Sequence, residues 1–483
     1  MAVILHVNYL PQARKAAAKE VVPTLFNLLE EGQADPNLQA HLGVHLDWIQ
    51  YRHNFREAVT VRRTLTGRGE PLPPVELAID VRQARLETFR EELIRAFDLI
   101  RSTGDLSDGV ILEPFGLCRS SVIWGFNRLF WHHLPAWEEA AGHSYDAALP
   151  GGKSDANHPE AVADSVVDFW KLLKDLERRN QLPAEIFVLE IGVGTGKRAR
   201  LWLDRFRALD AERGSGFYPR LRFLLSDYST PVLDKAMAAV RDHKEMVSLL
   251  VLDAMNPYRT LSFLRYKILY VHLTNVYDNL PTEELVRRDG RYYLVEVRSY
   301  LPARDAARIS EALGVPPGDL ARTIGKFLEI GPDYLPDRTR GVLFWREVWD
   351  SLRLEERLVS LDEVADPPLP HGLDFAHLED LLQEAPSVLR FHLSSGAVES
   401  FQNTLPLLHP RGYLQVQDIF VTEMGEYRHG FRGPGKLDGS VVNWVNGALL
   451  REVGARAGYD VHFAPFRYRE GSNTTLLHIT QRE

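Results

Sequence analysis

The stretch Phe187-Val-Leu-Glu-Ile-Gly-Val-Gly-Thr-Gly196 decides the fold class of this chain. Its apolar first half has the β-branched and aromatic bias of a buried strand, and an acid, Glu190, stands near its end. Three glycines follow at alternate positions: Gly192, Gly194 and Gly196. Residues 197–206 then show a helical pattern. The candidate core contacts of that helix are Leu201, Leu203 and Phe206. Strand, glycine turn and helix together bring the backbone close to a nucleotide-like ligand, because glycine lacks the Cβ that would block the approach.

The spacing of the glycines indicates which ligand the turn holds. A dinucleotide fingerprint, G-x-G-x-x-G, needs glycine at position 197, where Lys197 stands. A pyrophosphate is also disfavoured beside an acid, whereas the sulfonium and ammonium of S-adenosylmethionine suit one. The stretch therefore resembles motif I of the class I S-adenosylmethionine-dependent methyltransferases, which implies that Glu190 and the three glycines bind the cofactor. A glycine-rich turn in another α/β protein is the alternative.

Acids recur where later strands end. Residues 221–227 read as a second strand that ends in Asp227, and an acid at that place can accept hydrogen bonds from both ribose hydroxyls. Tyr228 follows it in the cofactor-binding set. A third strand, 247–252, leads into Asp253-Ala254, which the resemblance places against the adenine. Asp253 as a turn or cap residue is an equal alternative.

The fourth strand, 267–273, is followed by Thr274, the last predicted cofactor contact, and by polar groups that would face the acceptor. From their positions after strands, the candidate catalytic residues are Asn275, Tyr277, Asp278 and Asp418. Methyl transfer needs the acceptor lone pair aligned within about 3–3.5 Å of the methyl carbon. Where the acceptor is a nitrogen or hydroxyl, Asp278 or Asp418 could take its proton.

Residues 275–281, with the strand-like stretch 292–298, resemble the Asn-Glu-…-Asp-Ala-Leu-Pro block of the MidA-like methyltransferases. The resemblance continues in a helix at 394–400 and a fifth strand at 412–418. The family's Glu after the Asn is Val276 here. The resemblance implies the fold and the cofactor, and through a family member that methylates an arginine it suggests a protein acceptor.

The composition is that of a globular protein, with 483 residues, 45% hydrophobic and 25% charged. This length exceeds a single core and predicts two or three domains. The net charge of −9 disfavours a nucleic-acid partner. A single cysteine excludes an intramolecular disulfide, and adjacent histidines at 132 and 133 cannot share a metal on a helix, so we expect no metal. Without an apolar run of ~20 residues or a signal peptide, we expect a cytoplasmic protein with no membrane contact.

The elements predict an α/β fold, a Rossmann-like seven-stranded methyltransferase sheet that ends in an antiparallel hairpin. The hairpin strands are expected at 461–466 and 474–480. We expect the methyltransferase core at 156–301 and 387–483, and a mainly helical region at 1–155. The aromatic run at 121–137 within that region is expected to be helical core, and an aromatic substrate wall is the alternative. A helical insertion at 302–386 could cover the substrate or serve as scaffold.

The expected function is S-adenosylmethionine-dependent methyl transfer to an acceptor that is a protein side chain, such as arginine, or a small molecule. The first alternative is a binding or assembly protein that keeps the fold without catalysis. The second, an NAD-dependent oxidoreductase, is disfavoured by Lys197. The sequence does not determine the oligomeric state.

Overall fold

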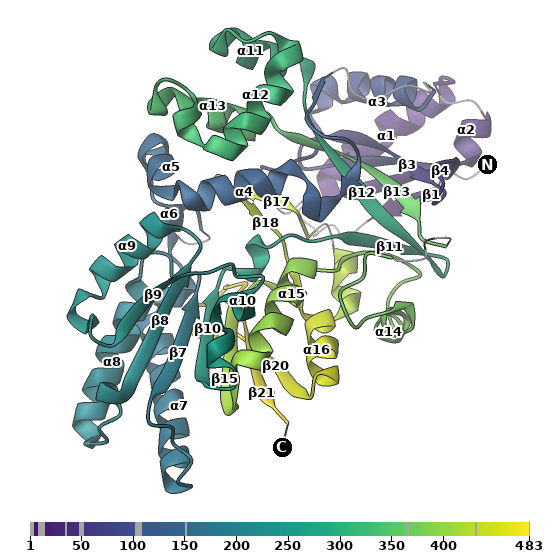
Figure 1. Ribbon diagram of the computed structural model, residues 1–483. Coiled ribbons are helices and arrows are strands. Elements are labelled where there is room, and N and C mark those ends of the chain that lie inside the picture. Colours follow the sequence, from purple (N-terminus) through teal and green to yellow (C-terminus); the bar gives the residue numbers. More distant parts are fainter. Residues whose placement is uncertain are drawn as a thin grey trace.

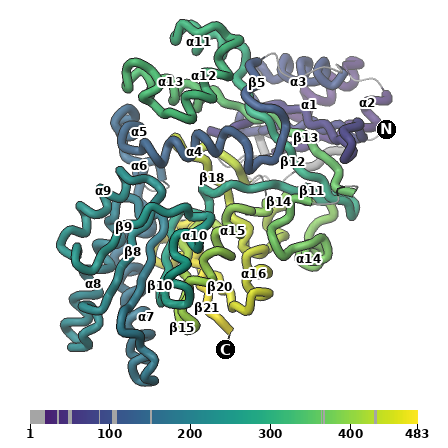
Figure 2. Tube along the Cα trace, in the orientation of Figure 1, coloured from purple at the N-terminus to yellow at the C-terminus, as the bar shows by residue number. Residues whose placement is uncertain are grey.

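The computed structural model describes residues 4–7, 15–33, 36–47, 53–101, 109–149, 152–362, 364, 367–429 and 432–482. Two large sheets organise this part of the chain, one of seven strands and one of ten. They occupy different halves of the molecule in Figures 1 and 2, with α4 (Val122–His132) between them. None of the helices described has the length and hydropathy that crossing a bilayer requires.

The seven-stranded sheet has the order β20-β21-β15-β10-β7-β8-β9. Its strands are β7 (Ile186–Ile191), β8 (Leu221–Asp227), β9 (Val247–Val251), β10 (Ile268–Thr274), β15 (Leu408–Asp418), β20 (Tyr459–Pro465) and β21 (Thr475–Gln481). The strands from β15 to β9 run parallel, whereas β21 is antiparallel to both β15 and β20. The chain adds β8 and β9 on one side of β7, then crosses to add β10 and β15 on the other. The winding direction therefore reverses between β7 and β10.

Helices cover both faces of this sheet (Figure 1). They are α7 (Pro159–Arg178), α8 (Lys197–Arg213), α9 (Thr230–Ala239), α10 (Pro257–Leu261), α15 (Ser395–Thr404) and α16 (Gly447–Arg456). Val188 packs in one hydrophobic cluster with α7, α8 and α9, and Leu189 packs in another with α10, α15 and α16. Because successive strand residues point to opposite faces, these clusters are the layers on the two sides of the sheet. The predicted α/β class is confirmed.

One predicted core contact of α8 is wrong. Leu203 and Phe206 are buried as expected, but Leu201 is 37% exposed. The buried stripe of the helix includes Trp202, and a neighbouring helical position lies about 100° further round the axis. Leu201 therefore faces solvent.

The ten-stranded sheet has the main order β1-β2-β4-β3-β13-β12-β11-β14, and β5 and β6 pair with β12. Its strands are β1 (Ile4–Val7), β2 (Leu42–Asp47), β3 (Val59–Leu65), β4 (Pro71–Asp80), β5 (Val110–Ile111), β6 (Gly116–Leu117), β11 (Glu284–Arg288), β12 (Arg291–Leu301), β13 (Arg353–Ser360) and β14 (Val388–His392). Two short pairs lie outside both sheets: β16 (Phe420–Val421) with β19 (Val445–Asn446), and β17 (Gly435–Leu437) with β18 (Ser440–Val442).

This second sheet differs from the sequence-based expectation. The region 1–155, expected to be mainly helical, contributes β1 to β6, and the helical insertion contributes β13. β11, β12 and β14, placed in the methyltransferase core by the boundaries 156–301 and 387–483, pair with these strands instead. The sequence pattern at 292–298 predicts a strand, and the structure has one there. The sheet that this strand joins is determined by its pairing with distant residues such as those of β13, which no local pattern indicates.

The remaining helices pack mainly around the ten-stranded sheet. They are α1 (Lys15–Glu30), α2 (Pro36–Ala40), α3 (Leu86–Arg101), α4, α5 (Leu134–Ala141), α6 (Tyr145–Ala148), α11 (Ala303–Leu313), α12 (Pro317–Ile330), α13 (Arg338–Ser351) and α14 (Phe375–Leu381). The aromatic run at 121–137 forms α4 and the start of α5, where Phe126 and Phe130 are buried against Trp345 and Trp349 of α13. The prediction of a helical core for this run is confirmed.

Candidate functional site

The glycine turn lies at the carboxyl end of β7, beside the point where the winding of the sheet reverses. In open α/β sheets, ligands bind in the crevice outside the strand ends at such a point. Gly192, Gly194 and Gly196 have φ values of 73°, 54° and 73°, a left-handed conformation that side chains with a Cβ rarely adopt. The alternate glycines are therefore required by the turn itself.

The three glycines differ in what surrounds them. A Cβ on Gly192 would lie 2.5 Å from Val276 Cγ2, and one on Gly196 would lie 2.8 Å from Ala236 Cα in α9. Around Gly194, no heavy atom of the described residues lies within 4 Å of that position, apart from the glycine itself and its two chain neighbours. Gly192 and Gly196 permit close packing, whereas Gly194 borders open space at the strand ends. A ligand could therefore approach the backbone at Gly194.

Asp227, the last residue of β8, lies against the same turn. Its Oδ1 accepts a hydrogen bond from the Ser229 N–H at 3.1 Å, and the Gly194 and Tyr228 N–H groups also donate to its carboxylate. Burial raises the pKa of Asp227 to about 6. Tyr228 turns its hydroxyl toward α4, where it donates to the Arg128 carbonyl at 3.0 Å. The predicted ribose acid and the glycine turn are thus brought together.

Glu190 has a direct partner that the sequence did not indicate. Its carboxylate is buried and accepts a hydrogen bond from Arg198 Nη1 of α8 at 2.8 Å. Burial raises the pKa of Glu190, and the Arg198 charge opposes that shift. The charge of the acid is therefore compensated within the protein. A direct contact between Glu190 and a cationic cofactor stays a prediction.

A chain of polar groups links this ion pair to the end of β10. Arg198 Nη2 donates to the Tyr270 hydroxyl at 2.7 Å, and that hydroxyl lies 3.1 Å from His272 Nδ1. His272 Nε2 lies 2.7 Å from the hydroxyl of Thr274, the last residue of β10. Burial lowers the pKa of His272 well below its usual range, so the ring is neutral at physiological pH. His272 therefore positions the Thr274 hydroxyl at the carboxyl end of β10, where the cofactor is expected.

The segment after β10 is fixed by Asp418 of β15. One carboxylate oxygen of Asp418 accepts the Tyr277 N–H at 2.9 Å, and the other accepts the Ile419 N–H at 2.8 Å. Tyr277 is 1% exposed and packs in the hydrophobic cluster that contains α15. Asn275 has a φ of 50° and turns the chain out of the strand. Asp418 therefore holds the backbone, and Tyr277 is a core residue rather than part of an open site.

Asp278 is the candidate base with the most suitable surroundings. Its Oδ1 accepts a hydrogen bond from Asn279 Nδ2 at 2.7 Å, and burial raises its pKa to about 7. Burial raises the pKa of Tyr145 in α6, and the charge of Asp278 raises it further, so the phenol lies near the acid. The Trp131 ring centroid is 4.8 Å from that of Tyr145, and its Nε1 donates to Asn279 Oδ1 at 3.1 Å.

Trp131 and Tyr145 were not predicted as site residues. The aromatic pattern around Trp131 indicated helical core, which is the more frequent role of such residues, and Tyr145 carried no local signal. Only the packing of α4 and α6 over the end of β10 places both side chains beside Asp278 and Asn279.

Asp253 forms a turn after β9, and its contact with adenine stays a prediction. It is exposed, and its Oδ1 accepts the Met255 N–H at 2.9 Å. The preceding Leu252 N–H donates to the Asp227 carbonyl at 3.0 Å, so the segment follows the end of β8. Ala254 is half-buried against the core. Among the described residues, no three acidic, histidine or cysteine side chains are grouped as a metal site would require.

Comparisons with known proteins give a distant structural similarity only. No family model matches the chain, and no curated protein matches it. Solved structures similar to it include a COG1565 superfamily member from Burkholderia thailandensis bound to S-adenosyl-homocysteine, at 12% identity and a TM-score of 0.41, covering 74% of this chain and 93% of that one.

Two further similar structures are those of the CurJ carbon methyltransferase and of DhpI in complex with SAH. The CurJ carbon methyltransferase is 12% identical with a TM-score of 0.30, covering 66% of this chain and 54% of that one. The DhpI–SAH complex is 9% identical with a TM-score of 0.30, covering 74% of this chain and 98% of that one. At these scores, a functional assignment has to rest on the geometry of the site itself.

Proposed function

We propose that this chain is an S-adenosylmethionine-dependent methyltransferase. The observation that carries the proposal is the open space at Gly194, bordered by the Asp227 carboxylate at the reversal point of a parallel sheet. The antiparallel β20–β21 end of the sheet, which closes the class I methyltransferase fold, supports it further. Lys197 at the position of the third dinucleotide glycine disfavours NAD.

The residues around this space fit the cofactor. Gly194 leaves room beside the backbone, Asp227 offers an acceptor for ribose hydroxyls, and Thr274 lies at the neighbouring strand end. We retain Gly192, Gly196, Tyr228, Asp253 and Ala254 as the rest of the binding set, and assign Glu190 a supporting place through Arg198. The bound cofactor supplies a methyl group activated by a sulfonium.

The chain's own contribution to transfer is alignment, exclusion of water and removal of a proton. Asn275 turns the chain at the end of β10, and Asp418 fixes the turn that carries Asp278. Asp278, with a pKa of about 7, is suited to accept a proton from a nitrogen or hydroxyl acceptor. Trp131 and Tyr145 would form an aromatic wall beside it. The acceptor itself, a protein side chain such as arginine or a small molecule, stays a prediction, as does a cytoplasmic location.

Titration calorimetry with S-adenosylhomocysteine tests the assignment. We expect wild type to bind it and Asp227→Asn to weaken binding by about tenfold or more, because a neutral amide replaces the carboxylate that accepts the ribose hydroxyls. Asp242 is an exposed acid between α9 and β9 of the seven-stranded sheet, so Asp242→Asn is the matched control and should bind like wild type. An absence of binding by wild type would overturn the cofactor assignment and favour the binding-protein alternative.

The buried Asp278 predicts a pH-dependent stability. An ordinary aspartate has a pKa of 3.8, whereas the pKa of Asp278 in the folded protein is about 7, because burial disfavours the charged form. The folded state therefore holds a proton that the unfolded state has released, so stability falls as pH increases from about 4 to about 7. Burial and the charge of Asp278 also raise the pKa of Asp418, so Asp278→Asn should remove part of this slope.

Urea unfolding between pH 4.5 and pH 8 measures this effect. The exposed substitution Asp242→Asn controls for the loss of one surface carboxylate. Equal slopes for wild type and Asp278→Asn would show that Asp278 does not hold the extra proton of the folded state, and would remove the basis for its role as a base near neutral pH. Full methyl transfer by Asp278→Asn would remove it from the catalytic set.

A further inference from the structure

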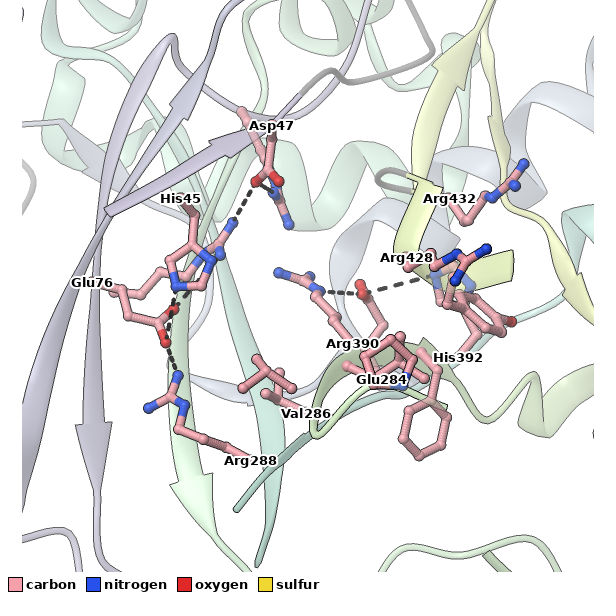
Figure 3. Close-up of a pocket in the computed structure, with 17 residues that line it drawn as sticks. His45, Asp47, Glu76, Glu284, Val286, Arg288, Arg390, His392, Arg428 and Arg432 are labelled. Carbon is pink, nitrogen blue, oxygen red and sulfur yellow. Dashed lines mark hydrogen bonds and ion pairs between the residues drawn. The ribbon is translucent and has the colours of Figure 1, made fainter. Parts of the chain in front are cut away.

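A cavity lies on the ten-stranded sheet, away from the site described above (Figure 3). Its volume is about 240 Å³, far more than a single water molecule needs. It is lined by β2, β3, β4, β11 and β14, together with residues that follow β16. A small metabolite fits a space of this size.

The strands turn alternate residues toward the cavity. β11 presents Glu284, Val286 and Arg288, and β14 presents Val388, Arg390 and His392. From the opposite wall β2 presents His45 and Asp47. Because a strand alternates its side chains between two faces, one whole face of these strands is directed inward and is dominated by charged groups. The inward face of a sheet that only packs on a core is apolar.

Positive charge prevails in this cavity. Six arginines line it: Arg56, Arg62, Arg288, Arg390, Arg428 and Arg432. Among the described residues, three carboxylates line it: Asp47, Glu76 and Glu284. Glu356 of β13 adds one more, with Arg56, Arg62 and Arg390 at 2.5–2.9 Å. Among these groups, guanidiniums outnumber carboxylates by two.

The titration of the neighbouring groups agrees with this excess. Burial would raise the pKa of Glu356, but the surrounding arginines hold it well below its usual range, so it stays charged. Burial lowers the pKa of His45 to about 4 and also lowers that of His392, so both rings are neutral. Burial lowers the pKa of Arg56 to about 10, and the nearby charges of Arg390 and Arg62 add to that shift. The arginines are thus close enough to repel one another.

Two arginines have donor atoms that the surrounding protein does not satisfy. Arg62 is 4% exposed, and its Nη2 makes no hydrogen bond within the described residues, with Asp47 at 3.8 Å. Arg288 pairs with Glu76, yet its buried Nη1 also lacks a hydrogen bond there. Leaving a buried charged donor unsatisfied is costly, and an acceptor oxygen in the cavity would remove that cost.

We propose that this cavity is a binding site for a small dianion, either a phosphate monoester or a dicarboxylate. Arginine matches both groups because its planar fork donates two parallel hydrogen bonds to paired oxygens. Their oxygens would supply the acceptors that Arg62 Nη2 and Arg288 Nη1 lack among the described residues. The site is built from the ten-stranded sheet and involves neither the glycine turn nor Asp227, so it is independent of the methyltransferase proposal.

Thermal unfolding with inorganic phosphate and with succinate tests the proposal, with sodium chloride at equal ionic strength as reference. A ligand that binds only the folded state raises the unfolding temperature saturably. We expect at least one dianion to do so in wild type. In Arg288→Gln the half-saturating concentration of that dianion should rise by about tenfold, because one charge-assisted hydrogen bond is lost. Arg322→Gln, an exposed arginine of α12 paired with Asp319, is the control and should respond like wild type.

The outcomes separate the sources of the anion. A response to phosphate alone identifies a phosphoryl group, and a response to succinate alone identifies a dicarboxylate. If neither dianion exceeds chloride in wild type, the network is purely structural and the proposal fails. Equal responses of Arg288→Gln and Arg322→Gln would also overturn it. If Arg288→Gln does not fold, Arg428→Gln, on the opposite wall, replaces it. Binding of S-adenosylhomocysteine should be the same in all of these variants.

Discussion

Gly194→Leu will abolish binding of S-adenosylhomocysteine while the protein stays folded. The Cβ position at Gly194 is open, so a Cβ there meets no described atom beyond its chain neighbours, and the rest of the leucine side chain would extend into the space proposed for the cofactor. With a φ of 54°, the substitution costs about 1–2 kcal/mol of backbone strain. We expect affinity to fall by about a hundredfold or more, equivalent to roughly 2.7 kcal/mol.

Two matched substitutions separate blocked binding from strain. Gly314→Leu, after α11, has a similar φ of 67° and equally open surroundings, so it carries the same strain and should bind normally. Gly196→Leu would push a Cβ to within 2.8 Å of the Ala236 backbone and should unfold the turn. Calorimetry together with thermal unfolding distinguishes the three variants. If Gly194→Leu binds like Gly314→Leu, the cofactor does not lie at this turn.

Arg198→Met will destabilise the protein by about 3–5 kcal/mol, because it leaves the Glu190 carboxylate buried without its partner. Removal of both charges in Glu190→Gln/Arg198→Met should recover part of that loss, since no uncompensated charge then remains. The measurement is the urea unfolding transition of the two single variants and the double variant.

Arg200→Met provides the control for this cycle. Arg200 lies on the same helix and pairs with Asp204 at 3.6 Å, but its side chain is 54% exposed. Exposed pairs contribute about 0–1 kcal/mol, so this variant should unfold nearly like wild type. Equal losses for Arg198→Met and Arg200→Met would contradict the buried pairing of Glu190.

The sequence by itself determined the elements whose pattern is local. The strand, glycine turn and helix of β7 and α8 were predicted because alternating glycines, an apolar run and helical periodicity all lie within 20 residues. β8, β9, β10 and β15 were found for the same reason, each as an apolar run before a polar residue. Asp227 could be placed beside the turn because parallel strand ends share one edge.

The tertiary structure alone decided which charges are compensated and which strands belong together. In the folded protein Glu190 pairs with Arg198, and the Tyr145 phenol lies near Asp278. The cavity on the ten-stranded sheet is lined by residues between His45 and Arg432 that are far apart in the sequence. An acidic residue near the end of a strand can bind a ligand, cap a turn or form an ion pair. Which of these it does depends on how deeply packing buries the carboxylate and on which donors or charges surround it. Strand pairing and desolvation arise from contacts between distant segments, so they are fixed only when the chain is folded.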